Sequence, residues 1–456
     1  MMRKTSLLGG AALGAVAAMG LAGTAQAQDL GVAWKGAPEF SNDDVRFKVR
    51  GRVYMDYVAQ DVDGEFDAIA NPGGTGDWSS SNTRLRTARL GVEGQWNAQW
   101  AYKAEVNFSQ NQAVWEDLIL EYKPTDTLSI MAGNYKMLSL ENITSSRYIT
   151  FMERGAFNDA IDAGRVATLS AKFNGPNWTA QVGASGDSVN NADVALDERL
   201  SFQGRATFAP IDTDTTKLHL GAWARQRDFN DEGLAAVPPV PAGGGEAGRY
   251  RVRNNTNVGD RFVDSGAGFG ESDTWFGAEA ALVWNSFSLQ GEYAHAEVDK
   301  RCTTALICTL GADQGEIDAV YVYASWFPTG EMRRYEANRG EFNRTRILNP
   351  VTAGGWGAVE LGLRYDNVDL TGLQTVRTFA GPGGPVDAAG PCDRCGEYSA
   401  VTLGANWYPF PYVRFMANYT MAENDNPLIV NPLTGVAGAN RDVDVDTFQM
   451  RAQFDF

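Results

Sequence analysis

Lysine and arginine side chains recur at every second position in parts of the sequence. Lys48, Arg50 and Arg52 form one such row. Side chains alternate between the two faces of a β-strand, so these three share a face with about 6.6 Å between neighbours. A guanidinium keeps its charge and can hold a phosphate or a carboxylate at two points. The row therefore predicts stepwise contacts with an anion along a strand.

Further basic residues are expected on the same polar faces or in one long connection. The candidate pore-lining or anion-binding residues are Lys48, Arg50, Arg52, Arg86, Arg89, Lys136, Arg147, Arg154, Arg205, Arg225 and Arg227. The same alternation places carboxylates beside them, among them Asp56, Glu93 and Glu105. The alternative interpretation is therefore a network of ordinary ion pairs along the polar faces.

Catalytic and metal sites are not expected. His219 and His295 are the only histidines, and neither has a serine partner arranged as a barrel hydrolase would need. We predict no enzymatic activity, no cofactor and no metal ion.

The charge balance excludes one class of partner. The chain has 39 Lys and Arg against 56 Asp and Glu, which gives a formal net charge of -17. Such a protein repels a phosphate backbone, so we expect no binding to nucleic acid.

Residues 1–27 have the features of a secretory signal peptide. A basic start and an apolar stretch lead to Ala25-Gln26-Ala27, which fits the small-residue cleavage pattern. The alternative is an anchoring helix. Beyond this segment no stretch approaches the roughly 20 consecutive apolar residues of a transmembrane helix. We predict a short periplasmic segment at residues 28–44 and one folded unit at residues 45–456.

The four cysteines form two close pairs, Cys302 with Cys308 and Cys392 with Cys395. An exported chain reaches an oxidising compartment, so we predict two local disulfides. A shared zinc site with four thiolate ligands is the alternative, and cross-pairing between the two pairs stays open.

Apolar and polar residues alternate in segments of about ten residues, a pattern typical of a transmembrane β-barrel. In the last segment Phe448, Met450 and Phe454 fall on one face, whereas Gln449 and Arg451 fall on the other. We predict an all-β antiparallel barrel of 16 strands. The expected strands lie near residues 45–61, 82–97, 99–110, 113–124, 127–136, 164–174, 177–187, 197–209, 215–229, 272–285, 286–299, 313–327, 356–370, 397–409, 411–424 and 443–456.

Aromatic residues gather beside the short turns, as Trp96 and Trp100 do. Amphipathic rings prefer the membrane interface, and a girdle of this kind is expected of an outer-membrane barrel. The turns next to the girdle would be periplasmic. Residues 328–355 break the pattern as a long excursion on that side.

Residues 136–163 form the candidate constriction loop. Leu140, Ile143, Phe151 and Met152 make this connection too apolar for a loop in solvent. We predict that it folds into the barrel and narrows the pore. The alternative is a folded extracellular cap.

Several short motifs are spread along the chain. They are residues 47–52 (FKVRGR), 86–94 (RTARLGVEG), 144–147 (TSSR), 326–331 (WFPTGE), 355–361 (GWGAVEL), 403–408 (LGANWY) and 451–456 (RAQFDF). Taken together, they resemble the phosphate-selective porin O and P family from about residue 45 to the C-terminus. The resemblance implies a 16-stranded barrel in the outer membrane of a Gram-negative bacterium, usually trimeric, with inward loops and basic residues that guide small anions.

The resemblance also implies roles for single residues. Arg52, Arg86, Arg147 and Arg154 match basic residues along the family's pore, and Phe456 matches the signal read by the barrel assembly machinery.

Two positions depart from the family pattern, and a third is geometrically unusual. Thr87 stands where phosphate-selective members have a second arginine, and Asn142 stands where they have a lysine. Arg86 shares its parity with the apolar Leu90 and Val92, so we predict that it reaches the lumen only through a bulge or above the lipid zone.

We therefore expect an outer-membrane porin for passive diffusion of small hydrophilic solutes, biased toward anions such as phosphate or other oxyanions. Its partners would be small anionic solutes, outer-membrane lipid and lipopolysaccharide, and two further copies of the chain in a homotrimer. The alternatives are a non-selective general porin and a barrel that serves mainly as a surface receptor or structural anchor.

Overall fold

The structure is a computed structural model of the whole chain. It describes residues 31–34, 36–64, 77–109, 112–190, 199–229, 248–266, 269–300, 314–374, 392, 394–426 and 442–456. The predicted signal peptide and both Cys302 and Cys308 lie outside these residues.

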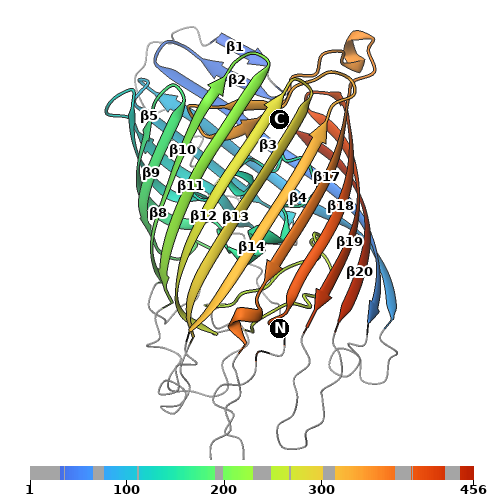
Figure 1. Cartoon of the computed structure of the whole chain (residues 1–456). Coiled ribbons are helices and arrows are strands. Elements are labelled where there is room, and N and C mark those ends of the chain that lie inside the picture. Colours follow the sequence, from blue (N-terminus) through green and yellow to red (C-terminus); the bar gives the residue numbers. More distant parts are fainter. Residues whose placement is uncertain are drawn as a thin grey trace, which may run out of the picture.

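Sixteen antiparallel strands close into a barrel, because the last strand pairs with the first (Figure 1). The barrel strands are β3 (Val45–Gly64), β4 (Trp78–Trp96), β5 (Trp100–Asn107), β6 (Val114–Tyr122), β7 (Leu128–Tyr135), β8 (Val166–Asn174), β9 (Trp178–Ser185), β10 (Leu200–Asp212), β11 (Thr216–Asp228), β12 (Gly270–Trp284), β13 (Phe287–Lys300), β14 (Gln314–Trp326), β17 (Ala358–Asp369), β18 (Glu397–Phe410), β19 (Val413–Asp425) and β20 (Val443–Asp455). The predicted fold class is confirmed, and each expected strand is present near its predicted bounds.

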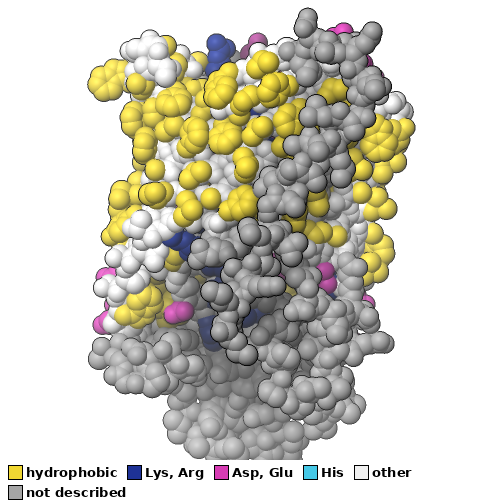
Figure 2. All heavy atoms as spheres, turned by 180° about the vertical axis from the view of Figure 1, so that it is seen from behind, with side chains coloured by type: hydrophobic (Ala, Val, Ile, Leu, Met, Phe, Trp, Pro, Cys, Tyr) yellow, Lys and Arg dark blue, Asp and Glu magenta, His cyan; other side chains and the backbone are white. Residues whose placement is uncertain are grey.

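The two faces of each strand differ in the way the alternation predicts. On β20, Phe448 and Met450 point outward, whereas Gln449 and Arg451 point inward and are buried. Apolar side chains cover much of the barrel's outer surface (Figure 2). An outward apolar band around a polar interior is the arrangement that a bilayer requires of a barrel.

Short turns join the strands at the end of the barrel that is uppermost in Figure 1. Exposed aromatic residues lie beside several of these turns. Trp284 and Phe287 flank one turn, and the Phe287 ring stacks on Trp326 of the next strand at 5.6 Å. This is the predicted interfacial girdle.

The first described residues form a small hairpin at the same end of the barrel. Strand β1 (Gly31–Trp34) pairs with β2 (Pro38–Ser41), and β2 pairs with the start of β3. The last residue also joins the wall there, since the backbone of Phe456 exchanges two hydrogen bonds with Gly51.

The connection between β7 and β8 makes hydrogen bonds to inward-facing side chains on distant strands. It contains two short helices, α2 (Leu140–Ile143) and α3 (Ala156–Ala160). The amide groups of Leu140 and Glu141 donate to Glu292 on β13, at 3.0 and 2.7 Å. Farther along, Arg414 on β19 donates to the carbonyl of Ile149 at 2.7 Å. The connection therefore packs against strands across the barrel from its own.

Residues 248–266, between β11 and β12, contact the same interior. Asn255 donates to Asp366 on β17 at 2.7 Å and accepts at its carbonyl from Gln449 on β20 at 3.0 Å. Its side-chain oxygen accepts from the amide of Ala156 at 3.0 Å, so this segment also touches α3.

The excursion between β14 and β17 turns into the barrel from the end with the short turns. It carries a hairpin of β15 (Arg334–Glu336) and β16 (Glu341–Asn343), followed by a turn of 3-10 helix, η2 (Val351–Ala353). The hydroxyl of Tyr335 lies 2.5 Å from His219 of β11, and the carbonyl of Gly340 accepts from Arg205 of β10 at 2.8 Å. The sequence predicted the excursion but not these inward contacts.

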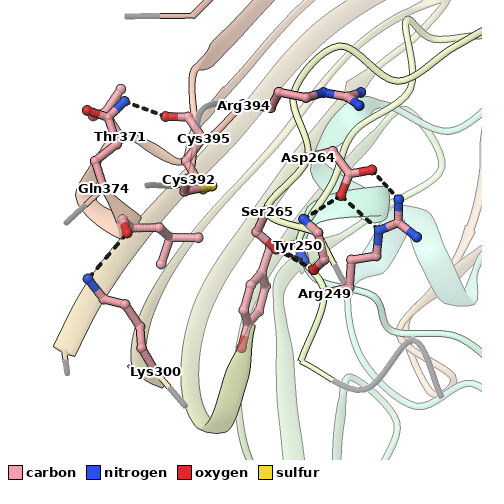
Figure 3. The surroundings of a disulfide bond; sticks show 12 residues. Arg249, Tyr250, Asp264, Ser265, Lys300, Thr371, Gln374, Cys392, Arg394 and Cys395 are labelled. Carbon is pink, nitrogen blue, oxygen red and sulfur yellow. Dashed lines mark hydrogen bonds and ion pairs between the residues drawn. A yellow bond between two sulfur atoms is a disulfide. The ribbon is translucent and has the colours of Figure 1, made fainter. Parts of the chain in front are cut away.

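The structure contains a disulfide between Cys392 and Cys395, just before β18 (Figure 3). Nearby, Gln374 donates to the carbonyl of Cys395 at 2.7 Å, next to the 3-10 turn η3 (Thr371–Leu373). The amide of Asp264 donates to the carbonyl of Arg394 at 2.7 Å. This corner therefore ties residues 248–266 to the start of β18.

Among the described residues no helix is long and apolar enough to span a membrane.

Candidate solute pathway

A basic cavity of about 650 Å³ lies against the inner face of strands β3 to β10. Residues of the β7–β8 connection and of the β15–β16 hairpin form its opposite side. Lysines and arginines outnumber carboxylates among its lining residues by fourteen to four. The basic lining residues are Arg46, Lys48, Arg50, Arg52, Arg89, Lys103, Lys136, Arg147, Arg154, Arg165, Lys172, Arg205, Arg339 and Arg344. The carboxylates are Glu93, Asp117, Glu121 and Glu341.

Most of the predicted basic residues lie together on this cavity. They are Lys48, Arg50, Arg52, Arg89, Lys136, Arg147, Arg154 and Arg205. The alternation along the strands places five of them there from three strands, and the β7–β8 connection contributes the other three from the opposite side.

Glu105 on β5 holds several of the arginines. Its carboxylate is fully buried and lies 3.0 Å from Arg52, 3.1 Å from Arg89 and 3.3 Å from Arg50. Arg147 approaches it to 3.9 Å. Charge-assisted hydrogen bonds of this kind fix the guanidinium planes against the wall. These arginines therefore belong to an ion-pair network in the lumen, which is the alternative interpretation that the sequence offered.

A second ion-pair cluster lies beside the first. Arg165 bonds two carboxylates of β6, Glu116 at 2.7 Å and Asp117 at 2.6 Å. Arg89 reaches Glu116 as well, at 2.7 Å, and Lys103 bonds Asp117. Arg89 therefore links the two clusters into one network.

Arg86 reaches the interior through the predicted bulge. The register between β3 and β4 shifts beside this residue, since Tyr54 pairs with Thr87 and Met55 with Leu85. Its guanidinium then bonds Glu153 of the β7–β8 connection at 2.8 Å. Arg86 is not among the residues that line the basic cavity, which differs from the prediction that placed it on the pathway. The physical reason is that Glu153 holds its side chain.

Glu153 is held as an anion by two arginines. Burial alone would raise the pKa of this carboxyl, but the charges of Arg86 and Arg451 outweigh it and lower the pKa below the usual range. Arg451 bonds both Glu153, at 2.8 Å, and Asp56, at 2.7 Å. This group of charges fastens the connection to β3, β4 and β20.

Arg225 and Arg227 line a smaller cavity of about 190 Å³ instead. Arg227 bonds Asp273 at 2.6 Å, while Arg225 donates to the carbonyl of Ile161 at 2.5 Å. Met137 and Arg165 line both this cavity and the basic cavity. The two cavities therefore adjoin at these residues.

Lys136 lies at the start of the β7–β8 connection. It contacts Asn142, the residue that replaces a lysine of the family pattern. Its ammonium donates to the Asn142 side-chain oxygen at 2.5 Å. Burial, followed by repulsion from Arg154 and Arg165, lowers the pKa of Lys136 well below the usual value for lysine. Arg154 itself donates to two carbonyls, those of Glu141 at 2.9 Å and Thr144 at 2.6 Å.

Several lining residues were missed in the sequence. Lys103 and Lys172 share the alternation that pointed to the others, so parity alone would have found them. Arg165 sits just before β8 and lacks such a signal. Arg339 and Arg344 lie in the excursion between β14 and β17. No local sequence pattern predicted that this excursion folds inward.

A closed barrel with an apolar outer band around a polar interior, with a basic cavity inside it, is the architecture of a porin. The model of the family "Phosphate-selective porin O and P" matches residues 47–456, and the chain belongs to this family. It is an integral protein of the outer membrane of a Gram-negative bacterium.

Other proteins are similar over most of the chain. An uncharacterized protein of Caulobacter vibrioides is 29% identical over 441 residues, which cover 93% of this chain and 77% of that protein. Among solved structures, OmpT of Vibrio cholerae in its trimer form has a TM-score of 0.49 and 12% identity, covering 91% of this chain and 100% of that one. The anion-selective porin from Comamonas acidovorans has a TM-score of 0.49 and 13% identity, with coverage of 91% and 100%.

Proposed function

We propose that the protein is a porin whose water-filled channel favours small anions, phosphate and other oxyanions among them. The observation that carries the proposal is the excess of basic over acidic side chains in the lining of the basic cavity, fourteen to four. A low-dielectric wall lined by one sign of charge raises the local concentration of the opposite ion. Membership of the phosphate-selective family supports the same bias.

The β7–β8 connection supports a narrow passage. It crosses the barrel to bond Glu292 and Arg414, and it forms one side of the basic cavity. We propose that it constricts the channel, as the sequence predicted, and that the β15–β16 hairpin adds a second narrowing. An extracellular cap would not make these contacts with inward-facing side chains.

Conductance with bulky ions tests the proposed selectivity. Single channels of the refolded protein are measured in potassium chloride and then with one ion replaced by a large one. We expect conductance to fall strongly when a bulky organic sulfonate replaces chloride, and little when a bulky ammonium ion replaces potassium. The reverse order would contradict the proposal. A protein that folds but opens no channels would favour the receptor or anchor alternative.

We propose that the channel has no enzymatic activity. His219 is buried between Tyr335 and the carboxylate of Glu279, 3.2 Å from its Nε2. His295 bonds Asp318 at 3.0 Å near the other end of the barrel. Among the described residues neither ring has a serine or threonine hydroxyl as a hydrogen-bond partner, which supports a passive role.

We propose a homotrimer that contacts its neighbours through the shorter side of the barrel. Strands β5 to β9 have eight or nine residues, whereas β10 to β14 have thirteen to fifteen. A strand that spans a bilayer needs about 9 to 11 residues. The short side is therefore the side least suited to face lipid. The remaining apolar band would contact outer-membrane lipid and lipopolysaccharide, and Phe456 would be read by the assembly machinery.

The lowered pKa of Lys136 leads us to expect that the anion preference of the channel depends on pH. A lysine is charged below its pKa, and the pKa of Lys136 is lowered, so its charge is lost at a lower pH than that of an exposed lysine. Arginines keep their charge throughout this range. We expect the anion-over-cation permeability ratio to fall as pH rises toward alkaline values.

The Lys136→Arg variant is the matched control for this titration. It keeps the positive charge at every pH tested, so its permeability ratio is expected to change less with pH than that of the unaltered protein. Identical pH profiles for the two proteins would show that Lys136 does not carry the effect.

A further inference from the structure

Three lysines of the basic cavity lack the ion pairs that hold most of its arginines. Lys48 lies on β3, Lys136 in the β7–β8 connection and Lys172 on β8. All three line the cavity, and each is half-buried. Within the described chain, Lys48 and Lys172 have no side-chain hydrogen-bond or ion-pair partner, and Lys136 bonds only the neutral Asn142. Each ammonium carries three donors. Their charge and most of their donors are therefore available to a solute.

The neighbouring arginines are arranged in the opposite way. Arg52 is 2% exposed and gives its donors to Glu105 and Ser146. Arg205 is 7% exposed and bonds Glu279 at 2.6 Å and the carbonyl of Gly340. A passing anion would have to displace a buried carboxylate to bond such a guanidinium, which is unfavourable because the carboxylate would be left unpaired.

We propose that anions in the basic cavity are bonded directly by Lys48, Lys136 and Lys172, whereas the carboxylate-paired arginines position the wall and the β7–β8 connection. The proposal rests on the proposed function, since it names the contact residues of the same channel. The ligand class is a small oxyanion such as inorganic phosphate, because its several acceptor oxygens match the free ammonium donors.

Lys103 offers a matched control within the same cavity. It lines the cavity as Lys172 does, but its ammonium is bonded to Asp117. Replacing either lysine with glutamine removes one positive charge from the lining. Only the replacement of an unpaired lysine removes a donor that is free to bond a solute.

The test measures how inorganic phosphate blocks chloride current through the refolded, full-length protein in a planar bilayer at neutral pH. The variants are Lys172→Gln, Lys136→Gln, the double variant and Lys103→Gln. Loss of one charge-assisted hydrogen bond corresponds to about a tenfold loss of affinity. We expect the half-blocking phosphate concentration to rise by about tenfold for Lys172→Gln, further for the double variant, and by clearly less for Lys103→Gln.

The outcomes separate the contact assignment from the proposed function. Equal weakening by Lys103→Gln and Lys172→Gln would overturn the proposal, since only the total charge would then matter. Unchanged block in the double variant would overturn it as well. An unaltered protein that prefers cations and shows no phosphate block would instead overturn the proposed function, and the contact assignment with it. A variant that does not fold is replaced by Lys172→Met or Lys48→Gln, which test the same contacts.

Discussion

Replacing Glu105 with glutamine is expected to destabilise the barrel by about 3 to 5 kcal/mol. The carboxylate is fully buried and is shared by Arg50, Arg52 and Arg89 within 3.3 Å. Glutamine has nearly the same shape but no charge, so Arg52 would be left buried without a counter-charge, which is strongly unfavourable. Arg50 and Arg89 would keep only their second partners, Glu93 and Glu116. The free energy of unfolding would be measured from the urea dependence of tryptophan fluorescence in lipid vesicles.

The control for this substitution is Glu121→Gln on the next strand. Glu121 also lines the basic cavity, but it is partly exposed and its nearest cation, Lys123, lies 3.7 Å away. Exposed ion pairs contribute about 0.2 to 1 kcal/mol. Equal shifts in the free energy of unfolding for the two variants would refute the structural role of the Glu105 cluster.

An arginine at position 403 is expected to impair membrane assembly. Leu403 is 49% exposed on the outer face of β18 and lies between Leu363 and Tyr419 of the adjacent strands. It stands four residues from Trp407 of the girdle, well inside the apolar band. A charged side chain facing lipid near the bilayer midplane costs about 2 to 4 kcal/mol.

The fraction of folded protein after insertion into vesicles measures this effect. Gln181→Arg is the control, because Gln181 faces the basic cavity from the short strand β9. The same charge placed inside is expected to leave assembly nearly unchanged, since the lumen is wet. Normal assembly of Leu403→Arg would contradict the orientation of the outer face.

The fold was predictable because a membrane barrel repeats one local rule. Each strand must alternate apolar and polar side chains, and the alternation on β20 alone separates Phe448 from Gln449. The rule even located an irregularity, since Arg86 had the wrong parity and the structure places a register shift there. Short turns and the aromatic girdle fixed the direction of the barrel.

Which cations pair with a carboxylate was not predictable from the same local rule. Parity put Arg52 and Lys48 on one face, but it could not show that Arg52 bonds Glu105 while Lys48 has no carboxylate partner in the described part of the chain. Arg52 and Glu105 are 53 residues apart, and their pairing depends on the register of two intervening strand contacts. The inward hairpin of Tyr335 depends likewise on contacts with β11, more than one hundred residues earlier in the chain.

The zero-current potential of the purified, refolded protein across a potassium chloride gradient tests the central claim most directly. The basic lining of the cavity predicts a potential whose sign reports anion preference, together with reduced chloride current when phosphate is added. A potential that reports cation preference, with no effect of phosphate, would contradict the account. It would mean that the carboxylates of the lumen dominate the channel.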